Sequence, residues 1–237
     1  LSRNVGNSYN TALGYAALAN NTGLSASNNV AVGHGALGTN TTSGNVAMGV
    51  TALRQNAGAN NTAVGYQSMS LSINMGTNTA VGYQSLKNNQ SGTGNTAIGE
   101  KAMMDNFQGK YNTAIGENVM LNNADGEYNT AVGSSALMQA NARYNTAVGY
   151  HTLINTTDGT NNTALGANAM NANASGSDNV AVGMRALERN QTNYNTAVGT
   201  YALALNVNGI FNTALGYGAL GANTAGYSSG PPVQWAN

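Results

Sequence analysis

The chain is organised by a nine-residue stretch that reads Asn145-Thr146-Ala147-Val148-Gly149-Tyr150-His151-Thr152-Leu153 and that occurs, with substitutions, thirteen times. The copies begin at Asn10, Asn29, Asn45, Asn61, Asn78, Asn95, Asn112, Asn129, Asn145, Asn162, Asn179, Asn195 and Asn212. Successive copies start 16 or 17 residues apart, apart from one interval of 19. This period is too short for the helical repeat families. It predicts a solenoid in which each repeat forms one coil.

Each position of the repeat, here called a column, has its own composition. Columns one, three and five are always Asn, Ala and Gly; column two is Thr or Val, and column four is aliphatic or Met. Column eight is small or β-branched, and column nine is Leu or Met. The two-residue alternation is typical of a strand, so we expect columns two and four on one face and columns one, three and five on the other. The Gly column predicts a corner or a close backbone approach, followed by a second short strand over columns six to nine.

Stacking these coils gives an all-β, parallel β-solenoid of about 13 coils, spaced about 4.8 Å apart and on the order of 60 Å long. The thirteen column-one Asn residues are expected to form a structural ladder, because stacked side-chain amides hydrogen-bond from coil to coil. A coil of about 17 residues encloses little more than one layer of side chains. Some apolar columns therefore require cover from another chain, and a closed homo-oligomer meets this need because identical ladders meet.

The repeat defines three segments. Residues 1–9 contain a degenerate echo of the repeat and are expected to form an N-terminal cap or partial coil, residues 10–220 form the solenoid, and residues 221–237 form a C-terminal cap or docking tail. The chain starts without an initiator Met or a signal peptide, and we expect it to be processed or partial.

The tail contains Pro231, Pro232 and Trp235, which include both prolines and the single Trp of the chain. Paired prolines cannot continue a sheet ladder, so we expect them to end the solenoid. Two interpretations stay open: Trp235 covers the last coil, or the tail docks on the next subunit of a filament.

The amino-acid composition argues against several classes of function. Only 7% of the residues are charged and the formal net charge is zero, which leaves no electrostatic footprint for nucleic acid. Cysteine is absent, so disulfides and thiol chemistry are excluded. No run of eighteen apolar residues occurs, and we expect no membrane insertion.

Residues capable of chemistry are scattered. His34 and His151 are seven repeats apart, roughly 34 Å along a solenoid, so they cannot share a metal. Glu100 and Glu117 occupy column six of consecutive coils, about 5 Å apart, which resembles a catalytic carboxylate pair. A flat ladder face with lysines nearby favours a solvated surface instead. We therefore expect no catalytic residue, no metal, no cofactor and no enzyme activity.

Two further sets of residues are candidate surface features. Aromatic residues at column six and directly before column one are candidates for ligand binding: Tyr66, Tyr83, Tyr111, Tyr128 and Tyr144. Stacked aromatic side chains also stabilise a solenoid without a ligand. Candidate glycosylation sequons begin at Asn20, Asn40, Asn60, Asn89, Asn155, Asn161, Asn173 and Asn190. We expect all eight in or beside turns.

The copy Asn78-Thr79-Ala80-Val81-Gly82-Tyr83-Gln84-Ser85-Leu86 resembles the repeat arrays of bacterial and phage tail-fibre-like proteins, and the repeats also resemble the heads of trimeric autotransporter adhesins. The resemblance implies a left-handed parallel β-roll, a homotrimer, a location at the cell surface or on a virion, and a role in attachment.

The sequence thus predicts a structural segment of an extracellular fibre or adhesin, such as a tail fibre or biofilm filament. Expected partners are further copies of the chain, as a homotrimer and in head-to-tail filaments, and cell-surface or matrix glycans. One alternative is an ice-binding solenoid that uses the column-two Thr ladder. Another is a glycan-binding solenoid that uses the tyrosine face. Exposure of column two would favour ice binding, and its burial between chains would favour the fibre.

Overall fold

The computed structural model describes residues 7–23, 26–73, 76–223 and 233–235. It comprises two compact units, Leu1–Asp125 and Gly126–Asn237, each built from the same coil. The prediction of an all-β parallel β-solenoid is confirmed, because the strands of each unit pair in parallel along the chain. In the described residues, no helix is long and apolar enough to cross a membrane.

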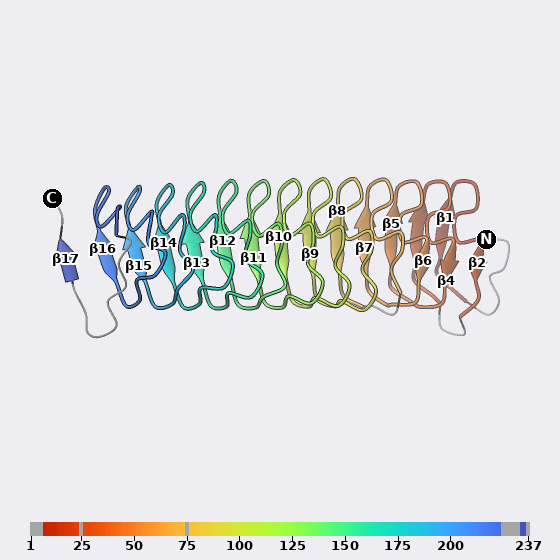
Figure 1. The fold of residues 1–237 in the computed structure, drawn as a ribbon. Coiled ribbons are helices and arrows are strands. Elements are labelled where there is room, and N and C mark those ends of the chain that lie inside the picture. Colours follow the sequence, from red (N-terminus) through yellow and green to blue (C-terminus); the bar gives the residue numbers. More distant parts are fainter. Residues whose placement is uncertain (1–6, 24–25, 74–75, 224–232, 236–237) are drawn as a thin grey trace. The chain divides into compact units, whose positions relative to one another are not determined.

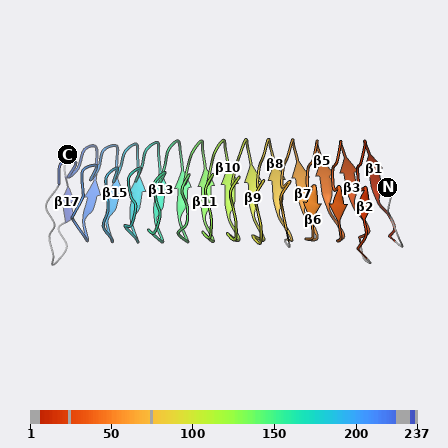
Figure 2. The same ribbon diagram turned by 45° about the vertical axis from the view of Figure 1, so that its right-hand side comes forward.

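In the first unit, one three-residue strand from each coil lies beside the next in sequence order (Figure 1). These strands are β1 (Thr11–Leu13), β3 (Val30–Val32), β5 (Val46–Met48), β7 (Thr62–Val64), β8 (Thr79–Val81), β9 (Thr96–Ile98) and β10 (Thr113–Ile115). Three two-residue strands form a separate parallel sheet, β2 (Asn20–Asn21), β4 (Thr39–Asn40) and β6 (Gln55–Asn56), with β4 in the middle (Figure 1). Figure 2 shows β2 and β6 from another side.

The second unit repeats the first arrangement. Its strands are β11 (Thr130–Val132), β12 (Thr146–Val148), β13 (Thr163–Leu165), β14 (Val180–Val182), β15 (Thr196–Val198), β16 (Thr213–Leu215) and β17 (Val233–Trp235). Strand β17 pairs in parallel with β16 and places the Trp235 backbone opposite Leu215. The ladder thus resumes after the paired prolines, contrary to the expectation that they end it. Pro231 and Pro232 themselves lie outside the described residues.

The register aligns equal columns of neighbouring coils: Thr opposite Thr or Val, Ala opposite Ala, and aliphatic opposite aliphatic, as in Thr79, Ala80 and Val81 against Thr96, Ala97 and Ile98. The three-residue strand of each repeat copy covers columns two to four, fewer than the five columns over which the alternation extends. The column-three Ala points inward and is fully buried in nearly every coil, whereas columns two and four face outward. The predicted division of the columns between two faces is therefore confirmed.

The predicted second strand over columns six to nine is wrong. Columns seven and nine adopt left-handed backbone angles in every coil, with φ of 46° to 52° at the column-nine Leu or Met residues. Columns eight and nine are both buried in the described coils, or nearly so, which an extended strand with alternating side chains cannot achieve. A left-handed residue other than Gly costs about 1–2 kcal/mol. Burial of a column-nine side chain, worth about 1.5–3 kcal/mol, offsets that cost.

The column-five Gly forms the expected corner. Its φ lies between 122° and 140° throughout. A Cβ built on Gly99 would lie 2.2 Å from the carbonyl oxygen of Gly116 in the next coil. Both the angle and the close approach of the two backbones therefore require Gly here.

The column-one Asn side chains form the expected ladder, although most of its bonds run from side chain to backbone. In both units, the Oδ1 atom of one Asn accepts the backbone N–H of the next, as in Asn78 to Asn61 at 3.0 Å and Asn179 to Asn162 at 3.1 Å. The Nδ2 atoms donate to carbonyls of the returning turn, as in Asn162 to Gly176 at 2.8 Å. These bonds satisfy polar groups that the thin core would otherwise leave unpaired.

A second Asn ladder runs through the core and was not predicted. It lies eleven residues after column one, here column twelve, where Asn occurs in ten of the thirteen copies. Its amides bond from coil to coil, for example Asn56 to Asn40 at 3.0 Å and Asn106 to Asn89 at 2.8 Å. Ser72 interrupts this ladder, and its buried hydroxyl has no partner.

Candidate functional surfaces

One repeated surface in each unit consists of the side chains of columns two and four, here called the strand face. Column four is aliphatic and partly exposed, for example 39% at Ile98 in the first unit and 47% at Leu165 in the second. The ten column-two Thr hydroxyls make no hydrogen bond within the described chain. A parallel sheet normally has both faces covered. The strand face is thus a regular, half-apolar surface that no other part of its own coils covers.

The candidate aromatic residues occur as two sets at opposite ends of the strands. Tyr66 and Tyr83, at column six, stack with ring centroids 5.6 Å apart. Tyr128 and Tyr144, directly before column one, stack at 5.2 Å. The ring of Tyr111 lies over Gly94, since a Cβ built there would meet its Cδ1 atom at 2.6 Å. These side chains are about half exposed, so they supply local platforms but do not converge on one site.

The second unit contains a stacked aromatic pair that the sequence analysis did not select. Tyr194 and Phe211 stack with centroids 5.0 Å apart and ring planes 4° apart. Both stand directly before column one, so the column position that selected Tyr128 and Tyr144 also marks this pair.

Some of the scattered charged residues interact with a neighbour. Lys101 lies 3.4 Å from Glu100, and the side chain of Asn118 donates to Glu117 at 3.1 Å. The histidines stack on tyrosines, His34 on Tyr15 at 5.4 Å and His151 on Tyr150 at 3.8 Å. Within the described residues, no group of three His, Cys, Asp or Glu side chains could hold a metal ion.

The sequons lie in or beside turns, as expected, but they divide into two groups by the exposure of the Asn side chain. Four belong to the column-twelve ladder and are fully buried: Asn40, Asn89, Asn173 and Asn190. Their amides donate hydrogen bonds inside the core, as in Asn89 to Gly92 at 3.2 Å. The folded chain cannot offer these amides to a glycosyltransferase. Four others are exposed: Asn20, Asn60, Asn155 and Asn161.

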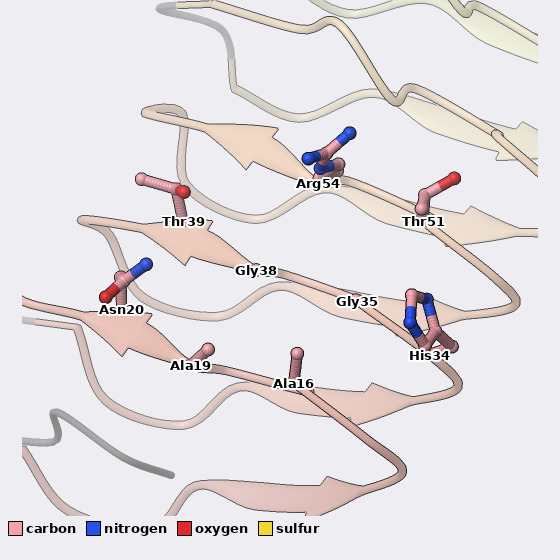
Figure 3. A pocket seen from close by; sticks show the side chains of 9 residues that line it. All are labelled: Ala16, Ala19, Asn20, His34, Gly35, Gly38, Thr39, Thr51 and Arg54. Carbon is pink, nitrogen blue, oxygen red and sulfur yellow. The ribbon is translucent and has the colours of Figure 1, made fainter.

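A concave site in the first unit lies over the first three coils. It is a groove of about 300 Å³ lined by Ala16, Ala19, Asn20, His34, Gly35, Gly38, Thr39, Thr51 and Arg54. Figure 3 shows His34 at one end, Asn20 and Thr39 at the other, and Thr51 and Arg54 from the third coil along one side. Its floor consists of alanines and glycines, so the groove exists because two consecutive coils carry small residues there.

No protein-family model, no curated protein and no solved structure matches the chain significantly.

Proposed function

We propose that the chain is a non-enzymatic structural segment of an extracellular fibre or adhesin, in which three copies associate through their strand faces. The observation that carries the proposal is the ladder of partly exposed aliphatic side chains at column four, repeated in every coil. The resemblance to adhesin heads and tail fibres supports three copies, a location at the cell surface or on a virion, and a role in attachment.

The energetics of the strand face support association along many coils. Ile98 is 39% exposed. Completing the burial of such a side chain contributes about 1 kcal/mol, since full burial is worth roughly 1.5–3 kcal/mol. Thirteen column-four side chains then contribute on the order of 10 kcal/mol per chain, comparable with the roughly 4–15 kcal/mol that association costs. Within each unit, identical ladders with the same coil spacing can meet coil by coil, which is how a repeated weak contact becomes a stable interface.

The test replaces two column-four residues in consecutive coils, Val64→Lys and Val81→Lys, and measures mass by sedimentation. The matched control carries the same charges in the same coils on another face, Gln67→Lys and Gln84→Lys. We expect the unmodified chain and the control to sediment as trimers. We expect the column-four variant to be monomeric, because unpaired ammonium groups buried between chains cost several kcal/mol each. An oligomer unaffected by the column-four lysines would refute the proposed interface.

Ice binding is the second candidate, and the unpaired column-two hydroxyls favour it. A flat sheet that repeats a Thr every coil spacing presents hydroxyl and methyl groups in a fixed lattice. Both functions use the same face, so they exclude each other in one assembly. Ice shaping and thermal hysteresis by a monomeric chain, abolished by Thr79→Lys, would favour ice binding, whereas a trimer without hysteresis would exclude it.

A further inference from the structure

The groove over the first three coils is a break in two side-chain ladders. The coils are numbered here in chain order. In coils four to nine, column seven carries a polar or charged side chain. Column ten, directly after column nine, carries Ser in coil four and a longer side chain in coils five to nine. Coil one instead has Ala16 and Ala19 at these columns, and coil two has Gly35 and Gly38. The surface is therefore lowered over two adjacent coils, beside Thr51 and Arg54 of the third (Figure 3).

The backbone does not require the glycines that open the groove. Gly35 has a φ of 65°, but Ala16 and Thr51 adopt nearly the same angle at the same column with a side chain. A Cβ built on Gly35 would contact only the Cγ2 atom of Thr51, at the ordinary van der Waals distance of 3.5 Å. The groove thus reflects the absence of side chains rather than a backbone constraint, and a longer residue can fill it.

The groove has a positive charge without a partner. Residues 1–99 contain neither Asp nor Glu, and the ion pairs of the described chain all involve acids from Glu100 onward. The guanidinium of Arg54 makes no ion pair or hydrogen bond within the described residues. Its planar set of donors fits a carboxylate or a sulfate. An anionic group of a ligand would therefore pair with the Arg54 guanidinium.

The remaining walls are polar at one end and aromatic at the other. Asn20 and Thr39 are exposed and supply amide and hydroxyl groups that can hydrogen-bond to ligand hydroxyls. His34, at the opposite end, stacks on Tyr15, which is 80% exposed. An aromatic platform of this kind packs against the apolar face of a sugar ring. The volume of about 300 Å³ is at the lower end of the range for small-molecule sites.

We infer that this groove binds an anionic saccharide, with its carboxylate or sulfate at Arg54, its hydroxyls at Asn20 and Thr39, and a ring face against His34, which stacks on Tyr15. The site is independent of the strand face, because it is formed by columns six to eleven. It therefore stays open whether or not the chain self-associates through columns two and four.

The test measures binding of three probes to the full chain by saturation-transfer NMR and calorimetry. Digalacturonate carries carboxylates, a heparin-derived disaccharide carries sulfates, and maltose is neutral. We expect binding of at least one anionic probe, weakened by salt, and no binding of maltose. The preferred anionic probe identifies which acidic group the groove takes. Equal binding of maltose, or no binding of either anionic probe at millimolar concentration, would overturn the inference.

Two variants locate the site. Gly35→Gln fills the groove with the residue that coils four and five carry at column seven, and Arg54→Gln removes the charge and leaves a shorter, neutral polar side chain. Each should weaken anionic-probe binding about tenfold or more. The control Gly218→Gln changes the same column in the last coil, where a Cβ meets no atom within 4 Å, and should bind as the unmodified chain does. If Gly35→Gln fails to fold by circular dichroism, Arg54→Gln decides alone. Unchanged affinity in a folded groove variant would refute the assignment.

Discussion

Replacing Asn162 with Ala tests the physical role of the column-one ladder. Asn162 is fully buried, and its Oδ1 accepts the backbone N–H and the side-chain amide of Asn179, each at 3.1 Å. Its Nδ2 donates to the Gly176 carbonyl at 2.8 Å and to the Oδ1 atom of Asn145 at 3.2 Å. Truncation deprives the Asn179 N–H of its acceptor, whereas the other partners keep a second hydrogen bond.

An orphaned buried N–H costs about 1–3 kcal/mol, and the loss of the three other bonds costs about 0.5 kcal/mol each. Asn162→Ala should therefore lower the free energy of unfolding by about 3 kcal/mol. The control is Thr163→Val, the next residue along the chain, at a column where Val occurs naturally in three copies. Its hydroxyl has no partner in the described chain, so the control should stay within about 0.5 kcal/mol.

Urea unfolding measures the difference, and hydrogen exchange at the Asn179 amide supplies a local readout. The local readout matters because a long repeat array need not unfold as one unit. We expect faster exchange of the Asn179 amide in Asn162→Ala and no change in Thr163→Val. A destabilisation below about 1 kcal/mol, with unchanged exchange at Asn179, would refute the view that the ladder holds the coils together.

Three further predictions follow from the core, the corner and the sequons. Leu153→Ala should cost about 2–5 kcal/mol in denaturant unfolding, whereas Leu153→Met should cost less than about 1.5 kcal/mol, because column nine accepts both residues; equal costs would contradict this packing. Gly99→Ala should open the stack and expose its coil to limited proteolysis, because the new Cβ meets the Gly116 carbonyl, whereas Gly218→Ala should stay resistant. In a host that attaches N-glycans, mass spectrometry should find glycans only at exposed sequons; glycan on folded chain at a buried sequon would contradict the column-twelve ladder. The exposed sequons are at Asn20, Asn60, Asn155 and Asn161, and the buried ones at Asn40, Asn89, Asn173 and Asn190.

The parts of the fold that were predictable depend on local alternation. The division of columns two and four from column three follows from the two-residue period of a strand. The corner at the Gly column follows from the residue type alone, since both its φ and its close contact exclude a side chain. The ladder at column one was predictable because an invariant Asn in every coil implies amides in register.

The turn over columns six to nine was not predictable from residue preference. Residues such as Leu86 and Lys101 do not favour left-handed angles, and their conformation is imposed by stacking on adjacent coils. A weak signal was present, because Gly35 and Gly218 occupy column seven and accept those angles without cost.

The second Asn ladder was missed although its spacing is written in the sequence. Four of its members, among them Asn40 and Asn89, also match the glycosylation motif, which accounts for each Asn singly and not for their common column. The groove likewise has a sequence signal, since Gly35 and Gly38 fall in columns that carry longer side chains in the coils that follow. Both features become visible only when the repeat is extended beyond its nine most regular positions.

The measurement that tests the central claim most directly is the mass of the unmodified chain in solution, by light scattering over a dilution series. One chain has a mass of 24.0 kDa. Association through the strand face predicts a mass of three times that value that persists on dilution. A chain that stays at 24.0 kDa at every concentration would contradict the claim and leave the column-two and column-four face open to another surface, with ice the first to examine.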